Sequence, residues 1–258
     1  MPYIDVGGER IFYALHENVP RGNSSLILIH GAGENHLVWP AALRRMPGVR
    51  VFAVDLPGHG KSGGRGRSSV AEYAAFTGRL LDALKIERAA IVGHSMGGAI
   101  AQQFGLTYPA RTAALILVAT GARLRVAPQL LKSTASDLPA AVELISHLEW
   151  GPGTPEQMIR LGRQQLLANR IEVLHGDYLA CNAFDVMERL GDIRAPTLVI
   201  GGTADQMTPP KYASTLAERI PGAQLALVEG AGHMVMLERE EAVARPVEQF
   251  LRAHALIN

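Results

Sequence analysis

The chain has 258 residues, with 25 Lys and Arg against 24 Asp and Glu, so its net charge is close to zero. This length suits one α/β domain with a substantial core, and the balanced charge gives no reason to expect binding to nucleic acid or to an anionic membrane. The single cysteine, Cys181, excludes an internal disulfide bond, and its neighbours have no metal-ligand spacing. A small, roughly neutral molecule is the expected substrate.

Residues 1–8 show neither the basic nor the apolar region of a secretion signal, and no later apolar run approaches the length of a membrane span. We therefore expect a soluble, cytoplasmic protein without a membrane partner. Residues 1–16 contain two short strand-like runs separated by Gly7-Gly8, which predicts an antiparallel hairpin at one edge of a sheet.

Farther along the chain, short apolar runs alternate with helical patterns, which is typical of βαβ units and a mostly parallel sheet. Strands covered by helices on both faces are almost continuously apolar. Six runs have this character: 26–29, 51–54, 89–92, 114–118, 197–200 and 224–228.

Three helices of the expected core have recognisable boundaries. Ser69 followed by Glu72 has the pattern of a capping box and predicts a helix that begins at residue 70. Thr208, ahead of two prolines, predicts the N-cap of another helix. Near the C-terminus Pro246 interrupts a helical pattern, so we expect a helix to begin or kink there.

Residues 123–195 lack a strand-like run and carry helical patterns at about 126–135, 138–148, 154–168 and 170–181. We expect a helical cap inserted before the last two strands, over a core formed by residues 1–122 and 196–258. Ligands bind at the carboxyl ends of the strands in open α/β sheets, so such a lid would set substrate choice.

The pentapeptide Gly93-His94-Ser95-Met96-Gly97 lies between the apolar run 89–92 and a helical pattern. Glycines on either side of a serine allow a sharp strand-to-helix turn that exposes the hydroxyl group. Ser95 is therefore a candidate nucleophile. A serine hydroxyl needs a base, and the base needs an orienting acid. His233 and Asp205 each follow a late apolar run, so they are the candidates for these two roles.

Because of the Ser95 motif and the positions of Asp205 and His233, the sequence resembles the α/β-hydrolase superfamily, and within it the small capped serine esterases, over nearly its whole length. The matching segments are His30-Gly31-Ala32-Gly33, residues 55–62, residues 93–98, Asp205 with its preceding glycines, and Gly232-His233. The order Ser95, Asp205, His233 is the chain order of that family. The resemblance also implies an oxyanion hole formed by the backbone N–H groups of Ala32 and Met96.

The other histidines and acids are expected to be structural. His30 and His59 should organise loops, and Asp55 should belong to a structural turn. The aspartates of the insertion, Asp137, Asp177 and Asp185, should face solvent.

Substrate-binding candidates are large or apolar residues near the active loops, together with Gly31 and His94, although each can equally be a packing residue. They are Gly31, Trp39, His94, Trp150, Met207 and Val235. Arg123 and Arg125 at the cap entrance are expected to be solvated. No cofactor or metal is expected, because the first loop lacks the third glycine of a dinucleotide fingerprint and no ligand cluster is present.

The leading function hypothesis is a carboxylesterase that acts on small to medium acyl esters. The resemblance argues against dehalogenases and epoxide hydrolases, because those members have an aspartate where this chain has Ser95. It also argues against perhydrolases, because perhydrolase-like members tend to have a proline in the oxyanion loop where this chain has Ala32. The second hypothesis is a carbon–carbon bond hydrolase of ring-cleavage diones, or an enol-lactonase. Those C–C hydrolases usually have a Gly-Pro-Gly-like stretch where this chain has Gly33-Glu34-Asn35. The third is a ligand-sensing protein that keeps a hydrolase pocket. The oligomeric state stays open.

Overall fold

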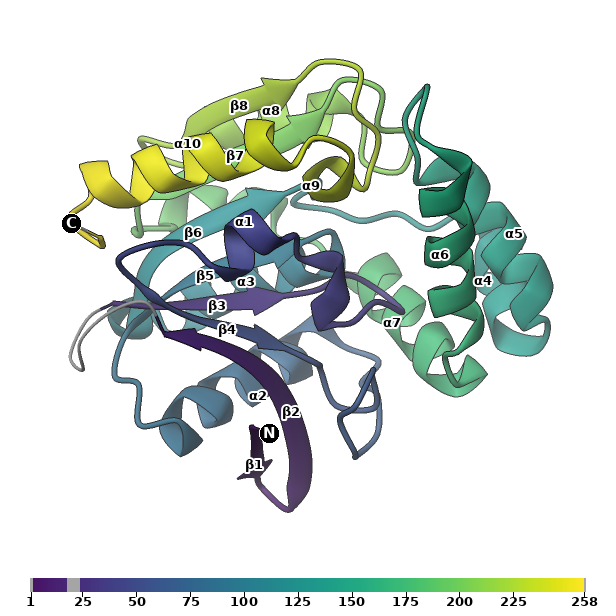
Figure 1. The fold of residues 1–258 in the computed structure, drawn as a ribbon, viewed down its shortest axis with the longest axis horizontal. Coiled ribbons are helices and arrows are strands. Elements are labelled where there is room, and N and C mark those ends of the chain that lie inside the picture. Colours follow the sequence, from purple (N-terminus) through teal and green to yellow (C-terminus); the bar gives the residue numbers. More distant parts are fainter. Residues whose placement is uncertain (1, 18–23, 258) are drawn as a thin grey trace.

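The computed structural model describes residues 2–17 and 24–257. Eight strands of this part form one sheet in the order β1-β2-β4-β3-β5-β6-β7-β8 (Figure 1). β1 and β2 form the predicted antiparallel hairpin, β2 pairs antiparallel with β4, and all later pairs are parallel. The strands are β1 (Tyr3–Val6), β2 (Glu9–Glu17), β3 (Ser25–Ile29), β4 (Arg50–Val54), β5 (Ala89–His94), β6 (Thr112–Val118), β7 (Thr197–Gly202) and β8 (Gln224–Val228).

Helices cover both faces of this sheet, as Figure 1 shows. The core helices are α1 (Ala41–Arg44), α2 (Val70–Ala83), α3 (Met96–Thr107), α8 (Pro210–Arg219), α9 (Val235–Glu238) and α10 (Glu240–Ala253). Short 3-10 helices are η1 (His36–Val38), η2 (Pro109–Arg111) and η3 (Met187–Asp192). Side chains of α2, α3 and α8 pack with one set of alternating strand residues, and those of α1 and α10 pack with the other. The near-continuous apolar runs thus supply two core layers.

β8 departs from the expectation of a strand covered on both faces. It is the edge strand of the sheet, and Leu225 and Leu227 are more than 40% exposed. An apolar run alone does not reveal which strand lies at the edge of the sheet.

The helix boundaries test three expectations. Ser69 caps α2, since its side chain accepts a hydrogen bond from the N–H of Ala71. Thr208, however, does not cap α8: Pro209 occupies the N-cap position. α10 begins at Glu240 and continues through Pro246, so the proline does not start that helix.

Four α-helices lie between β6 and β7, beside the end of the sheet toward which the parallel strands point (Figure 1). We call them the cap helices: α4 (Pro128–Ser136), α5 (Leu138–Leu148), α6 (Glu156–Leu167) and α7 (Ile171–Ala183). They enclose an apolar cluster of their own, which includes Leu130, Val142 and Leu174.

Asp177 of α7 is the main polar contact between the cap helices and the core, and it is fully buried. Its carboxylate faces His59 Nε2 at 2.7 Å and accepts hydrogen bonds from the Tyr73 hydroxyl at 2.6 Å and the Gly33 N–H at 2.9 Å. The expectation that Asp177 faces solvent is therefore wrong. Its partners lie more than a hundred positions away in the chain, so local sequence gave no sign of its burial.

His59 organises its loop, as expected. Its Nδ1 faces the Pro57 carbonyl oxygen at 3.0 Å, while its Nε2 faces Asp177, so both ring nitrogens meet acceptors. Burial lowers the pKa of His59, but the Asp177 carboxylate more than offsets this and raises it above the ordinary value. His30 and Asp55 are also buried loop residues: His30 Nε2 accepts the Leu56 N–H, and Asp55 accepts the Lys61 N–H.

None of the helices in the described ranges is both long and apolar enough to cross a membrane.

Candidate active site

Ser95 sits in a strained turn between β5 and α3. Its φ is 51° and its ψ is −114°, a backbone conformation that residues other than glycine rarely adopt. A Cβ atom at Gly93 would lie 2.1 Å from the Gly97 carbonyl oxygen, and one at Gly97 would lie 2.1 Å from that of Ile29. Both glycines of the motif are thus needed for close backbone approach rather than for a positive φ.

The backbone on each side of the Ser95 side chain is fixed. Its N–H donates to the Val118 carbonyl at 2.9 Å, and its own carbonyl accepts from the Thr120 hydroxyl at 2.7 Å. The serine is partly exposed, whereas the residues on either side of it are buried. The fold therefore presents Ser95 at the start of a helix and directly after His94, whose ring contacts the loops after β3 and β8.

His233 and Asp205 meet in the loops after β8 and β7. His233 Nδ1 lies 2.9 Å from Asp205 Oδ2, and both side chains are buried. Asp205 also accepts N–H bonds from Met207 and Thr208 and a 2.7 Å bond from the Thr208 hydroxyl. Burial raises the pKa of Asp205, but His233 and these donors together bring it below the ordinary value. An ionised Asp205 fixes the proton of His233 on Nδ1, which leaves Nε2 free to act as a base.

Thr208 is a site residue that sequence reasoning assigned to a helix cap. Its hydroxyl donates to Asp205 Oδ2, the same oxygen that His233 faces. The signal in the sequence was its position three residues after Asp205, a spacing at which an aspartate commonly bonds back to its own loop.

His94 connects the histidine loop with the loop after β3. Its Nε2 lies 3.0 Å from the His233 carbonyl oxygen, and its Nδ1 lies 3.0 Å from Glu34 Oε2. Burial lowers the pKa of His94, but the nearby Glu34 carboxylate raises it by a larger amount, so the net shift is upward. Because Glu34 and the His233 carbonyl occupy both ring nitrogens, His94 is not placed to accept a proton from Ser95.

Glu34 is a second residue that sequence reasoning did not assign to the site. It is buried, and its Oε2 accepts the Gly31 N–H at 2.6 Å besides facing His94. Burial raises the pKa of Glu34, but His94 and Gly31 hold it below its ordinary value. Through this carboxylate the loop that carries Ala32 is joined to His94, the residue before Ser95.

The N–H groups of Ala32 and Met96 are the expected oxyanion donors. Met96 is the first residue of α3, where N–H groups have no partner within the helix. Neither N–H donates a hydrogen bond to another residue in the described part of the chain. Both remain available to a substrate oxygen.

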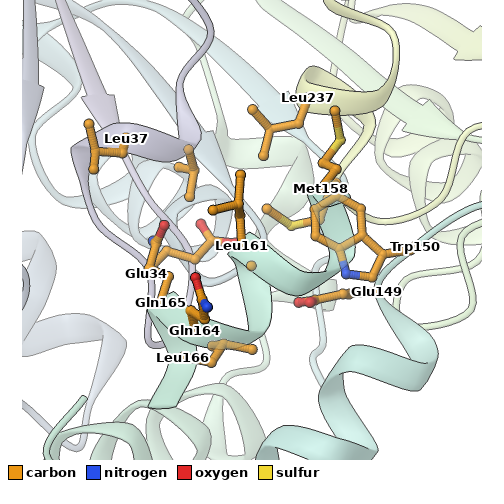
Figure 2. Close-up of a pocket in the computed structure, with 13 residues that line it drawn as sticks. Glu34, Leu37, Glu149, Trp150, Met158, Leu161, Gln164, Gln165, Leu166 and Leu237 are labelled. Atoms are coloured by element: carbon orange, nitrogen blue, oxygen red, sulfur yellow. The ribbon is translucent and has the colours of Figure 1, made fainter. Parts of the chain in front are cut away.

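A cavity of about 620 Å³ lies between the cap helices and these loops (Figure 2). It reaches the loops after β3 and β8 through Glu34 and through Met234, which follows His233; Ser95 is not among its lining residues. Apolar side chains dominate the lining, and Glu34 and Glu149 are its acidic members. The residues are Glu34, Leu37, Val38, Glu149, Trp150, Met158, Leu161, Gly162, Gln164, Gln165, Leu166, Met234 and Leu237.

Among the substrate-binding candidates, Trp150 lines this cavity. Trp39 and Val235 are fully buried in the core layer of α1 and α10 and do not line it. Met207 belongs to the Asp205 turn, where its N–H donates to the carboxylate. Gly31 and His94 both contact Glu34 and lie outside the cavity lining.

The remaining charged candidates lie outside the cavity. Arg123 pairs with Asp185 at 2.6 Å on the surface, in agreement with the expected solvated role, and Arg125 is exposed.

A sequence model of the alpha/beta hydrolase family matches residues 26–245. The chain is 30% identical to the pimeloyl-acyl-carrier-protein methyl ester esterase of Pectobacterium carotovorum, over 90% of this chain and 96% of that protein. It is 31% identical to the 2-hydroxy-6-oxononadienedioate/2-hydroxy-6-oxononatrienedioate hydrolase of Burkholderia vietnamiensis, over 97% of this chain and 95% of that one. A solved thermophilic esterase shares 33% identity with a TM-score of 0.86, over 98% of this chain and 97% of its own.

Proposed function

Because the chain belongs to the alpha/beta hydrolase family and is a hydrolase, we propose that it cleaves carboxylic esters of small to medium acyl groups through an acyl-enzyme on Ser95. The observation that carries this proposal is the strained Ser95 turn beside a buried His233–Asp205 pair. A backbone held in such a conformation persists only where the surrounding structure fixes it, and these positions cluster at active sites.

In the proposed reaction His233 Nε2 takes the proton of the Ser95 hydroxyl while Oγ attacks the ester carbonyl carbon. Asp205 keeps the Nδ1 proton in place and stabilises the imidazolium that forms. The imidazolium then returns the proton to the alcohol oxygen as the bond to that oxygen breaks. Water, deprotonated by the same nitrogen, attacks the acyl carbon of the acyl-enzyme. The imidazolium then returns this proton to Ser95 Oγ as the bond from Oγ to the acyl carbon breaks and the acid leaves.

The carbonyl oxygen becomes negatively charged in both tetrahedral intermediates. The N–H groups of Ala32 and Met96 are the donors assigned to it, since neither has another acceptor in the described structure. Loss of one such donor typically raises the barrier by about 3 kcal/mol. Both are backbone groups, so their position depends on the Glu34 and Ser95 contacts rather than on the side chains at 32 and 96.

The charge of the cavity supports uncharged substrates. Its lining holds two glutamates and no Lys or Arg among the described residues. A carboxylate or phosphate on the substrate would find no cationic side chain in this lining, and an unpaired buried charge costs several kcal/mol. We therefore infer neutral acyl chains, unlike the dioate that the name of the Burkholderia vietnamiensis relative specifies.

The test is turnover of a p-nitrophenyl ester series of increasing acyl length, with Ser95→Ala as the blank. We expect hydrolysis by the wild type, loss of activity in the variant, and labelling of the wild type alone by a fluorophosphonate probe. Ester turnover that survives Ser95→Ala would overturn the assignment.

A second candidate, cleavage of a carbon–carbon bond in a ring-cleavage dione or of an enol-lactone, is favoured by the 31% identical hydrolase. Rapid bleaching of a dienone substrate, with negligible turnover of every ester, would select this alternative.

A further inference from the structure

Glu149 follows α5 and joins the cap helices to the loop of the catalytic histidine. Its backbone carbonyl accepts the N–H of His233 at 2.9 Å and that of Met234 at 3.1 Å. The residue is 6% exposed. Its position is thus set by main-chain hydrogen bonds that a change of side chain leaves in place.

The Glu149 side chain lines the cavity, and its Oε1 is buried without a hydrogen-bond partner among the described residues. In Figure 2 its carboxyl group points into the cavity from the segment beside Trp150. The indole N–H of Trp150, which also lines the cavity, is likewise buried and has no partner within hydrogen-bond geometry, but it lies near enough to the Glu149 carboxyl group to lower its pKa. An acceptor and a donor from consecutive residues thus lie close together without a hydrogen bond of full geometry, so that one ligand group can serve both.

Buried polar groups without partners are rare, because each costs roughly 1–3 kcal/mol in lost hydration. A hydroxyl group satisfies both at once, since it donates to the carboxylate and accepts from the indole N–H. A methyl group satisfies neither, and an ammonium group cannot accept from Trp150. A carboxylate would find no cationic partner in the lining.

We propose that Glu149 and Trp150 form a subsite for a hydroxyl group on the substrate chain, an inference that rests on the proposed esterase function. The rest of the lining specifies the chain that carries the hydroxyl. Leu37 and Leu161 are more than 50% exposed at the cavity, and Met158 and Leu166 lie deeper in it. Burial of alkyl groups against such an apolar surface is favourable. The favoured substrate class is an ester with a hydroxyl-bearing aliphatic chain.

Two ester series of matched length test the subsite, one ending in a methyl group and one in a hydroxyl group. We expect the wild type to favour the hydroxyl ester in kcat/KM, by about tenfold at the length that reaches the subsite, as one well-formed hydrogen bond provides. Glu149→Leu and Trp150→Phe should each reduce this ratio toward one. Glu149→Gln, which keeps an acceptor, should restore most of it.

Glu143→Leu is the matched control. Glu143 lies on α5, is exposed, pairs with Arg163 and is outside the cavity lining, so its replacement should leave the ratio unchanged. An unchanged ratio in both Glu149→Leu and Trp150→Phe would overturn the subsite, as would equal loss of turnover for both ester series. Trp150→Phe keeps the ring and provides the test if Glu149→Leu does not fold.

Calorimetric binding of both ester series to the Ser95→Ala protein separates this inference from the proposed function. Tighter binding of the hydroxyl ester, lost on adding Glu149→Leu, supports the subsite even if the wild type hydrolyses no ester. Ester turnover without this binding preference leaves the esterase assignment standing and removes the subsite.

Discussion

The Gly33 N–H donates to Asp177 of the cap helices at 2.9 Å. The carbonyl of the same glycine accepts a 2.6 Å hydrogen bond from Asn169, which precedes α7. Gly33 follows Ala32, whose N–H is a proposed oxyanion donor. The cap segment therefore holds the loop that positions this donor, in addition to covering the cavity.

Asp177→Asn should lower both stability and turnover. The substitution removes a buried charge that faces His59 and accepts from Tyr73, and breaking a buried ion pair typically costs about 3 kcal/mol or more. Because the Gly33 bond is weakened as well, we expect kcat/KM to fall by at least about tenfold. Chemical denaturation and ester kinetics measure the two effects. Asp185→Asn, which removes an exposed partner of Arg123, is the control and should change stability by less than about 1 kcal/mol.

Ser95→Gly should stabilise the protein while abolishing turnover. The backbone at Ser95 has a φ of 51°, and such a conformation costs about 1–3 kcal/mol for a residue other than glycine. The glycine variant is free of this strain but has a more flexible unfolded state, so we expect its free energy of unfolding to rise by about 1 kcal/mol. Urea denaturation should show this gain for Ser95→Gly and not for Ser95→Ala, which keeps the strain. Equal stability of the two variants would contradict the argument.

Thr208→Val should slow the proposed reaction while leaving Ser95, His233 and Asp205 in place. The variant keeps the shape of the side chain but loses the 2.7 Å hydrogen bond to Asp205 Oδ2. Hydrogen bonds to charged groups contribute about 1.5–3 kcal/mol, so kcat/KM should fall by about tenfold. Thr208→Ser, which keeps the hydroxyl, should restore most of the rate. Wild-type kinetics in Thr208→Val would show that the other partners of Asp205 suffice to orient His233.

Glu149 should make the protein less stable as the pH rises through the weakly acidic range. Burial and the charges of Glu34 and Glu238 raise its pKa from 4.5 to about 7, against the opposite effects of Trp150 and His94. The folded state therefore binds more protons than the unfolded state between these values, and stability falls as the pH rises from 4.5 to about 7.

Glu149→Gln removes this titration. At about 1.4 kcal/mol per unit of pKa, the variant should gain up to roughly 3 kcal/mol over the wild type at neutral pH and nothing at the acidic end. Urea denaturation at a series of pH values measures the difference, with Glu143→Gln as the exposed control. Parallel stability curves for wild type and Glu149→Gln would contradict the raised pKa.

The parts of this protein that short-range sequence determines were predictable. Apolar runs form the strands, the two glycines of the hairpin and of the 93–97 motif permit close turns, and the cap helices follow their own periodicity. The pairing of Asp205 with His233 also followed, because residues at the carboxyl ends of neighbouring parallel strands meet at one edge of the sheet.

Tertiary structure alone decided which polar residues are buried and what they contact. Asp177 has the same local surroundings as an exposed helical aspartate, yet its partner Gly33 is 144 positions away. Glu34 and Glu149 likewise gain their roles from loops distant in sequence. A strand or a turn is set by neighbouring residues, whereas the burial of a carboxylate depends on donors that only the folded chain brings within hydrogen-bond distance.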